Sequence, residues 1–255
     1  MNKNLLSFLF HILLGSPAVM AADTACFAEA NARFKAGDFA VAATAYETLL
    51  ANGGPRASVF YNLGNSYHRL GQYGPAILAY ERARLLTPRD PDLLANLALA
   101  RKAAAAFEET VVHPRLDALI CYPSRNEWSW LVAGAALFVG GLALVCGLVN
   151  LPRRGMRQAA LASAGLASLA IAAGSACLYL RRDESNRGIV LSENAAVHLS
   201  PFETAASLGT PGPGRIVHMR KESGGFHYVE VPGTTLRGWL PDKEVGAITP
   251  SKDGK

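Results

Sequence analysis

The sequence is poor in charged residues, and its positive charge is not clustered. Only 18% of its 255 residues are Asp, Glu, Lys or Arg, and the net charge is +5. A domain that binds nucleic acid concentrates Lys and Arg on one face or along one helix. Here these residues are dispersed along the chain. The composition therefore indicates no nucleic-acid partner.

Cysteine is scarce, and its spacing matches neither a metal site nor a disulfide framework. The chain has four cysteines and no CxxC pair. Cys26 and Cys121 lie outside the long apolar segments. An oxidising compartment would permit a disulfide between them, but a sequence cannot show that two residues are close. Their pairing stays open.

Motifs of catalysis are missing as well. The chain contains no GxSxG, HExxH, Walker A or dinucleotide-binding fingerprint. Its six histidines fall in different segments. His218 and His227 could face each other on paired strands, but no third ligand or nucleophile accompanies them. His68 has no partner at metal-ligand spacing and is expected at the surface. We therefore expect no enzymatic activity, no cofactor and no metal.

The beginning of the chain has the features of an export signal. Lys3 precedes an apolar run from Leu5 to Leu14, and small residues follow up to Ala22. Charged, apolar and small-residue regions in this order predict a secretory signal peptide over residues 1–22. The apolar run is shorter than the roughly 20 residues that a spanning helix needs. An uncleaved anchor is the alternative, and both interpretations export the chain that follows.

A repeat of 34 residues organises the next part of the chain. Residues 57–90 contain small, aromatic and aliphatic residues in the order of a tetratricopeptide repeat (TPR). The small side chains of Gly64 and Ala76 let the two helices of a hairpin approach closely, and Gly71 suits the turn between them. One repeat earlier the equivalent positions carry matching residues, and residues 91–106 supply one more helix. We expect a TPR domain over residues 23–107, with two hairpins and a capping helix.

The repeat register also aligns polar side chains. Two asparagine pairs and one pair of cations are each separated by 34 residues. In a TPR the first helix of each hairpin lines the concave groove. The amides would offer donors and acceptors to an extended peptide backbone, and the cations would favour a carboxylate. The alternative is that the asparagines cap helices or bridge adjacent repeats, with solvated cations. The predicted groove consists of Asn31, Lys35, Asn62, Asn65, Arg69 and Asn96.

Two long apolar stretches follow a linker at residues 108–127. Residues 128–150 and 158–180 are each long enough to cross a membrane, and residues 151–157 leave room only for a tight hairpin. Three arginines in that connection suit the cytoplasmic side. With an exported N-terminal domain, two crossings return the C-terminal segment to the outside. A soluble helical hairpin is the alternative.

A small β domain is predicted for residues 188–249, after a linker at 181–187 and before a tail at 250–255. Its expected strands are 188–191, 196–199, 215–220, 226–231 and 238–241. The late run Gly238-Trp239-Leu240 resembles the signature of bacterial SH3-like barrels. Phe226 stands where such domains usually have Trp, which weakens a cell-wall-binding role. Tyr228 and Trp239 form a possible ligand face, with a place in the core or rim as the alternative.

The whole arrangement resembles BatE-like proteins of the Bacteroides aerotolerance (Bat) operon. The resemblance is carried by the TPR residues around Gly64, by the run Asn96–Arg101 and by Gly238-Trp239. It implies partners such as von Willebrand A-domain membrane proteins and a MoxR-type AAA+ ATPase, in an envelope complex linked to oxygen or stress tolerance.

We therefore expect a multidomain protein of the bacterial inner membrane. Its fold class would combine all-α TPR hairpins, a two-helix transmembrane hairpin and a C-terminal all-β SH3-like barrel, with both soluble domains extracytoplasmic. The expected function is that of a non-enzymatic scaffold that binds partner proteins in the TPR groove. The alternative is an envelope sensor whose SH3-like domain binds a cell-wall or peptide ligand.

Overall fold

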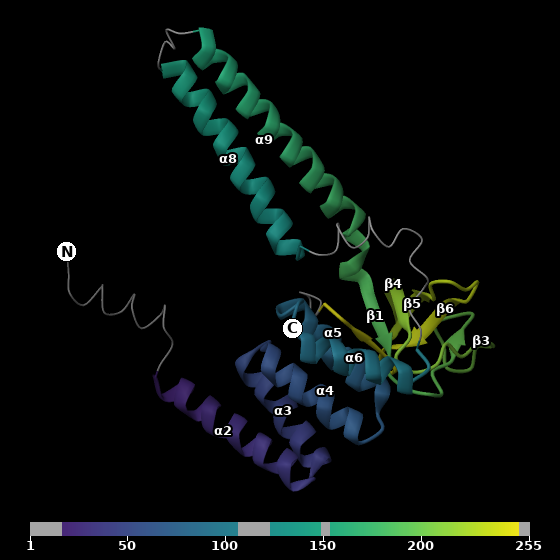
Figure 1. Cartoon of the computed structure of the whole chain (residues 1–255). Helices are drawn as coiled ribbons and strands as arrows, with labels where there is room; N and C mark the ends of the chain where they lie inside the picture. Colours follow the sequence, from purple (N-terminus) through teal and green to yellow (C-terminus); the bar gives the residue numbers. More distant parts are fainter. Residues whose placement is uncertain (1–16, 107–122, 149–153, 250–255) are drawn as a thin grey trace. The chain divides into compact units, whose positions relative to one another are not determined.

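The computed structural model describes residues 17–106, 123–148 and 154–249. They divide into two compact units. One unit contains the N-terminal helices together with the C-terminal strands, and the other contains two long apolar helices (Figure 1). Most of the predicted signal peptide, Cys121, most of the predicted linker at 108–127 and the first three residues of the predicted loop lie outside the described residues. The signal peptide therefore stays a prediction, and the pairing of Cys26 stays open.

The N-terminal helices form antiparallel hairpins that lie side by side (Figure 1). This confirms the helical hairpins predicted for this part of the chain. The first helix already begins inside the predicted signal peptide and continues past Ala22 without a break. The helices are α2 (Pro17–Ala36), α3 (Phe39–Gly53), α4 (Ala57–Arg69), α5 (Tyr73–Leu86) and α6 (Pro91–Ala103).

Local sequence explains where these helices begin and end. The turns within the two hairpins contain Gly37 and Gly71, one repeat apart, with φ angles of 89° and 74°. Glycine adopts this left-handed conformation without the steric penalty of a side chain. Helix α6 is capped by Asp90, whose carboxylate accepts hydrogen bonds from the backbone N–H groups of Asp92 and Leu93.

Close approach of α4 and α5 depends on Gly64. A Cβ atom at this position would lie 2.6 Å from the ring of Tyr80, which is fully buried. The equivalent pair one repeat earlier, Ala30 and Tyr46, is also buried. The aromatic ring of the second helix therefore fills the space beside a small residue of the first helix in both repeats.

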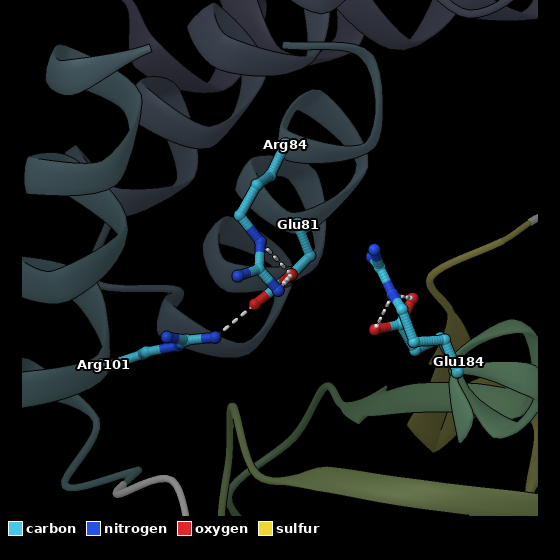
Figure 2. A network of polar contacts seen from close by, with 5 residues as sticks. Glu81, Arg84, Arg101 and Glu184 are labelled. Carbon is cyan, nitrogen blue, oxygen red and sulfur yellow. Dashed lines mark hydrogen bonds and ion pairs between the residues drawn. The ribbon is translucent and has the colours of Figure 1, made fainter. Parts of the chain in front are cut away.

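A buried carboxylate joins α5 to α6. Only 2% of the Glu81 side chain is exposed, and its two oxygens face two arginines from different helices (Figure 2). Arg84 lies 2.7 Å from Oε2, and Arg101 binds Oε1. Charge-assisted hydrogen bonds of this kind offset the cost of removing a carboxylate from water. The network fixes the last helix of the array against the second repeat.

The C-terminal strands form one seven-stranded antiparallel sheet in the order β3-β2-β6-β5-β4-β1-β7. Each of the five predicted strands has a counterpart, but the predicted count was too low by two, because β3 and β7 add the edges of the sheet. Closure into an SH3-like barrel stays a prediction. The strands are β1 (Arg187–Val190), β2 (Val197–His198), β3 (Ser207–Gly209), β4 (Ile216–Ser223), β5 (Phe226–Glu230), β6 (Arg237–Pro241) and β7 (Val245–Ala247).

The sheet belongs to the same compact unit as the repeats. One of its apolar clusters consists of residues of the C-terminal segment alone and includes Val197, Val229 and Leu240. A second cluster joins Ile189 of β1 and Ile248 to buried residues of α4, α5 and α6. The sheet therefore has a core of its own and a shared core with the helices.

The second unit is an antiparallel pair of helices, α8 (Arg125–Leu148) and α9 (Arg154–Leu180), which lie side by side (Figure 1). They differ from the predicted boundaries, because α8 begins three residues earlier and α9 includes part of the predicted loop. A Cβ atom on Gly174 would lie 2.6 Å from Val132, so this glycine is where the helices meet. The predicted linker after α9 contains the short 3-10 helix η1 (Arg182–Asn186).

Candidate functional site

The side chains of the predicted groove come from α2 and α4, the first helices of the two hairpins, and from α6. In the first repeat, the carbonyl oxygen of Asn31 accepts two hydrogen bonds. One comes from the hydroxyl of Tyr46 at 2.6 Å, and the other comes from the amide nitrogen of Asn62 at 2.9 Å. Asn62 belongs to α4, so this pair bridges adjacent repeats.

The same arrangement recurs one repeat later. The carbonyl oxygen of Asn65 accepts from the hydroxyl of Tyr80 at 2.7 Å and from the amide nitrogen of Asn96 at 3.0 Å. The Asn96 nitrogen also donates to the hydroxyl of Tyr61 at 2.9 Å. The four asparagines therefore form two equivalent bridges, which is the alternative arrangement considered from the sequence. Binding of a peptide to them stays a prediction.

A hollow of about 250 Å³ lies over the second of these bridges. Its floor contains the polar side chains of Asn65, Asn96 and Tyr80, and apolar and cationic side chains form the rest of its lining. Three of the six predicted groove residues therefore lie together, whereas Asn31, Asn62 and Lys35 are outside this hollow. The lining consists of Phe34, Asn65, His68, Arg69, Tyr80, Asn96 and Leu99.

The two predicted cations differ in their surroundings. The guanidinium of Arg69 lies over the ring of Phe39, 4.5 Å from its centroid, and the residue is exposed. This cation–π contact positions the charge at the edge of the hollow. Lys35 is also exposed. No acidic side chain lines the described hollow, so its charge favours an anionic group.

Burial raises the pKa of the two tyrosines that donate hydrogen bonds to the asparagines. Removal from water raises the pKa of the Tyr80 phenol above its ordinary value of 10.0, and the neighbouring Tyr61 adds to this. The pKa of Tyr46 is raised by burial as well, and its hydrogen bond to Asn62 lowers it in part. Both phenols therefore remain neutral donors at physiological pH, and each fixes one lone pair of an asparagine oxygen.

The possible ligand face of the sheet contains a packed aromatic pair. Tyr228 and Trp239 are directly opposite each other on β5 and β6, with ring centroids 5.4 Å apart and an interplanar angle of 76°. His198 of β2 is paired with Trp239 on its other side. Both aromatic residues are half-buried, and ligand binding at this face stays a prediction.

Sequence reasoning missed three side chains that contribute to the hollow: Phe34, His68 and Leu99. The repeat register contained part of the signal, because Phe34 and His68 are one repeat apart, and so are Asn65 and Leu99. His68 was expected only as a surface residue. The role of Tyr46 and Tyr80 in holding the asparagines could not be read from spacing alone.

A family model of the tetratricopeptide repeat matches residues 27–93. This stretch contains the second half of α2, all of α3, α4 and α5, and the start of α6. The TPR assignment therefore holds for this region, and such repeats indicate protein–protein interaction. No curated protein sequence matches the chain.

Two helices of the second unit, by length and composition alone, are apolar enough to cross a membrane. Their large apolar side chains point outward. For example, Leu137 is 78% exposed, Leu161 is 74% exposed and Leu169 is 67% exposed. A helix in the core of a soluble protein would bury such side chains, so this exposure favours an apolar solvent around the pair.

Proposed function

We propose that this chain is a non-enzymatic adaptor of the bacterial inner membrane, which binds an extended segment of a partner protein on the concave face of its repeats. The observation that carries the proposal is the hollow over Asn65 and Asn96, whose lining combines polar, apolar and cationic side chains. These are the features that bind a peptide backbone, an apolar side chain and a carboxylate, respectively.

The hydrogen bonds within the floor determine what it offers to a peptide. Two donors occupy the carbonyl oxygen of Asn65, so its amide nitrogen is the group available to donate. The amide nitrogen of Asn96 donates twice, so its carbonyl oxygen is the group available to accept. A donor next to an acceptor matches the alternating C=O and N–H groups of an extended backbone.

The cationic edge adds a preference for a negative group. Arg69 is exposed and held by its contact with Phe39. A planar guanidinium binds carboxylates through paired hydrogen bonds. We infer that the bound segment carries an acidic side chain or a free C-terminus beside an apolar residue, which Phe34 and Leu99 would contact.

The helices α8 and α9 anchor this binding module at the membrane in the proposed function. Their backbone hydrogen bonds are satisfied within each helix, as the hydrocarbon interior of a bilayer requires. In this proposal the predicted signal peptide exports the repeats, which then lie on the extracytoplasmic side. The resemblance to BatE-like proteins suggests von Willebrand A-domain membrane proteins and a MoxR-type ATPase system as partners in an envelope complex.

The direct test uses the full chain in detergent or nanodiscs. Peptides selected from a random library on the native protein are measured again on an Asn65→Asp variant. This substitution keeps an oxygen for Tyr80 and Asn96 but replaces the free N–H donor with a second oxygen. We expect at least a tenfold weaker affinity, about 1.4 kcal/mol.

Two comparisons make this result specific. An Arg69→Glu variant should lose affinity for acidic peptides, whereas Arg33→Glu, an exposed cation of α2 that does not line the hollow, should bind as the native chain does. Equal affinities for all the variants would contradict the assignment of the groove.

A further inference from the structure

The two repeats differ on one face of their second helices. Helices α3 and α5 are equivalent, one repeat apart, and three positions along each can be compared. The α3 stripe is exposed, and the hydroxyls of its threonines bond to the backbone of their own helix. The α5 stripe is buried at its first two positions and half-buried at the third. The α3 stripe consists of Ala40, Thr44 and Thr48, and the α5 stripe of Gly74, Leu78 and Arg82.

The C-terminal sheet covers the α5 stripe. A Cβ atom on Gly74 would overlap the carbonyl of Leu191 and lie 2.7 Å from that of Val190, so the strand end and the helix touch backbone to backbone. Leu78 packs on Gly246 of β7, where an added Cβ atom would lie 3.4 Å from its Cγ.

Arg82 completes this contact. Its Nε and Nη2 atoms donate to the carbonyl of Ala247 at 3.2 and 2.8 Å, and burial lowers the pKa of its guanidinium. The equivalent residue of the first repeat, Thr48, is exposed. The hydrogen bonds from Arg82 to a carbonyl of the sheet segment make this a specific contact. Without the sheet, the α5 stripe would face water.

The position of the sheet matches a structural need of the repeats. A repeat buries its apolar face only against a neighbour, and the last repeat needs a cap. In the described part of the chain, α5 and α6 are the last helices of the array, and no third hairpin follows them. Their core residues Ile77 and Leu93 instead share a cluster with Ile189 and Ile248.

We propose that the C-terminal sheet is the cap of the repeat array, docked on the α5 stripe, and that this docking holds both soluble segments on one side of the membrane. Both apolar helices lie between the two segments in the sequence. They must therefore cross and return, with their connection on the opposite side. This inference uses the anchoring by α8 and α9 from the proposed function, but it does not depend on peptide binding.

Cross-linking of the full chain in its membrane tests the docking. In a background without native cysteines, Leu78→Cys is combined with Gly246→Cys, and a protease site is inserted between residues 107 and 122. After oxidation and cleavage, we expect the two fragments to remain joined until reduction. The control pair is Thr44→Cys with Gly246→Cys, the equivalent position on the first repeat, which should separate. Separation of both pairs, or links only between different chains, would overturn the proposal.

Labelling of single cysteines tests the sidedness and does not disturb the contact. Positions 102 and 243 are exposed lysines, and position 155 lies at the start of α9. An impermeant maleimide should label Lys102→Cys and Lys243→Cys from the same side and Gly155→Cys from the other. Labelling of the two lysine positions from opposite sides would refute the docking. This result is decisive even if the paired cysteines of the cross-linking experiment prevent folding. If all three positions are inverted, the cap stands and the extracytoplasmic placement in the proposed function fails.

Discussion

Replacement of Gly74 by alanine distinguishes a docked sheet from a free one, because the two cases predict opposite changes in the free energy of unfolding. Alanine in a helix is more stable than glycine by about 0.5–1 kcal/mol. If nothing covered α5, Gly74→Ala would therefore stabilise the protein. In the structure, however, the new methyl group meets the backbone carbonyls of Val190 and Leu191. Backbone atoms cannot move aside as a flexible side chain can.

The size of the opposing effect follows from the packing. Overpacking of a well-packed contact costs about 1–3 kcal/mol. Contact with backbone atoms favours the upper part of this range, about 2–3 kcal/mol. After subtraction of the gain in helix propensity, about 0.5–1 kcal/mol, Gly74→Ala should lower the free energy of unfolding by about 1–2.5 kcal/mol. A change of 1 kcal/mol shifts the melting temperature of a unit of this size by about 2–4 °C. We therefore expect a decrease of about 2–10 °C.

The assay uses the purified full chain in detergent, with Trp128 and Trp130 replaced by Phe so that Trp239 alone reports the unfolding of the sheet. The matched control is Ala40→Gly at the equivalent exposed position of α3. It should cost only the propensity difference, about 0.5–1 kcal/mol. An increase in melting temperature for Gly74→Ala would show that α5 does not carry the sheet, and the argument for a cap would fail.

Two further predictions concern buried polar groups of the repeats. Glu81→Gln should destabilise the unit by about 3 kcal/mol in the same assay, because it removes the charge that compensates the largely buried Arg101. The control Glu29→Gln, in an exposed ion pair, should change the free energy of unfolding by less than about 0.5 kcal/mol. Equal effects of the two substitutions would contradict the role of the network. The raised pKa of Tyr80 means that its contribution to stability is complete below pH 10 and is lost as the pH rises above that value. The free energy of unfolding, measured between pH 8 and 11, should therefore fall more steeply above pH 10, and it should fall less steeply in Tyr80→Phe. An identical pH profile for both chains would refute the assignment.

The hairpins could be predicted because their spacing depends on contacts that are local in sequence. Gly64 allows the close approach of two helices, and Gly71 allows the turn between them. The same requirements recur with the 34-residue period. The asparagines were found by the same period, but their hydrogen-bond partners were not. Whether an amide faces a peptide or a neighbouring helix depends on the rotamer and on a tyrosine fifteen residues away, and spacing contains no such information.

The edges of the sheet were missed for a different reason. The segments Ser207–Gly209 and Val245–Ala247 have only three residues each and lack a clear alternation of apolar and polar side chains. They are strands because β2 and β1 present free edges for them to pair with. Pairing between distant segments, and not local propensity, defines such short strands, so no window of sequence identifies them.

The contact between sheet and repeats left a trace in the sequence that only a comparison of the two repeats makes visible. Where the first repeat has Thr44, the second has Leu78, and a leucine on an exposed helix face has no local reason to be there. The same helix α5 carries Tyr80 beneath the hollow and Leu78 beneath the sheet. Helix α5 therefore contributes Tyr80 to the floor of the proposed groove, whose asparagines come from α4 and α6, and carries the docking surface of the cap. A groove built in this way depends for its shape on a segment that the ribosome makes only after both apolar helices, so the complete chain, and not the repeats alone, is the unit expected to bind.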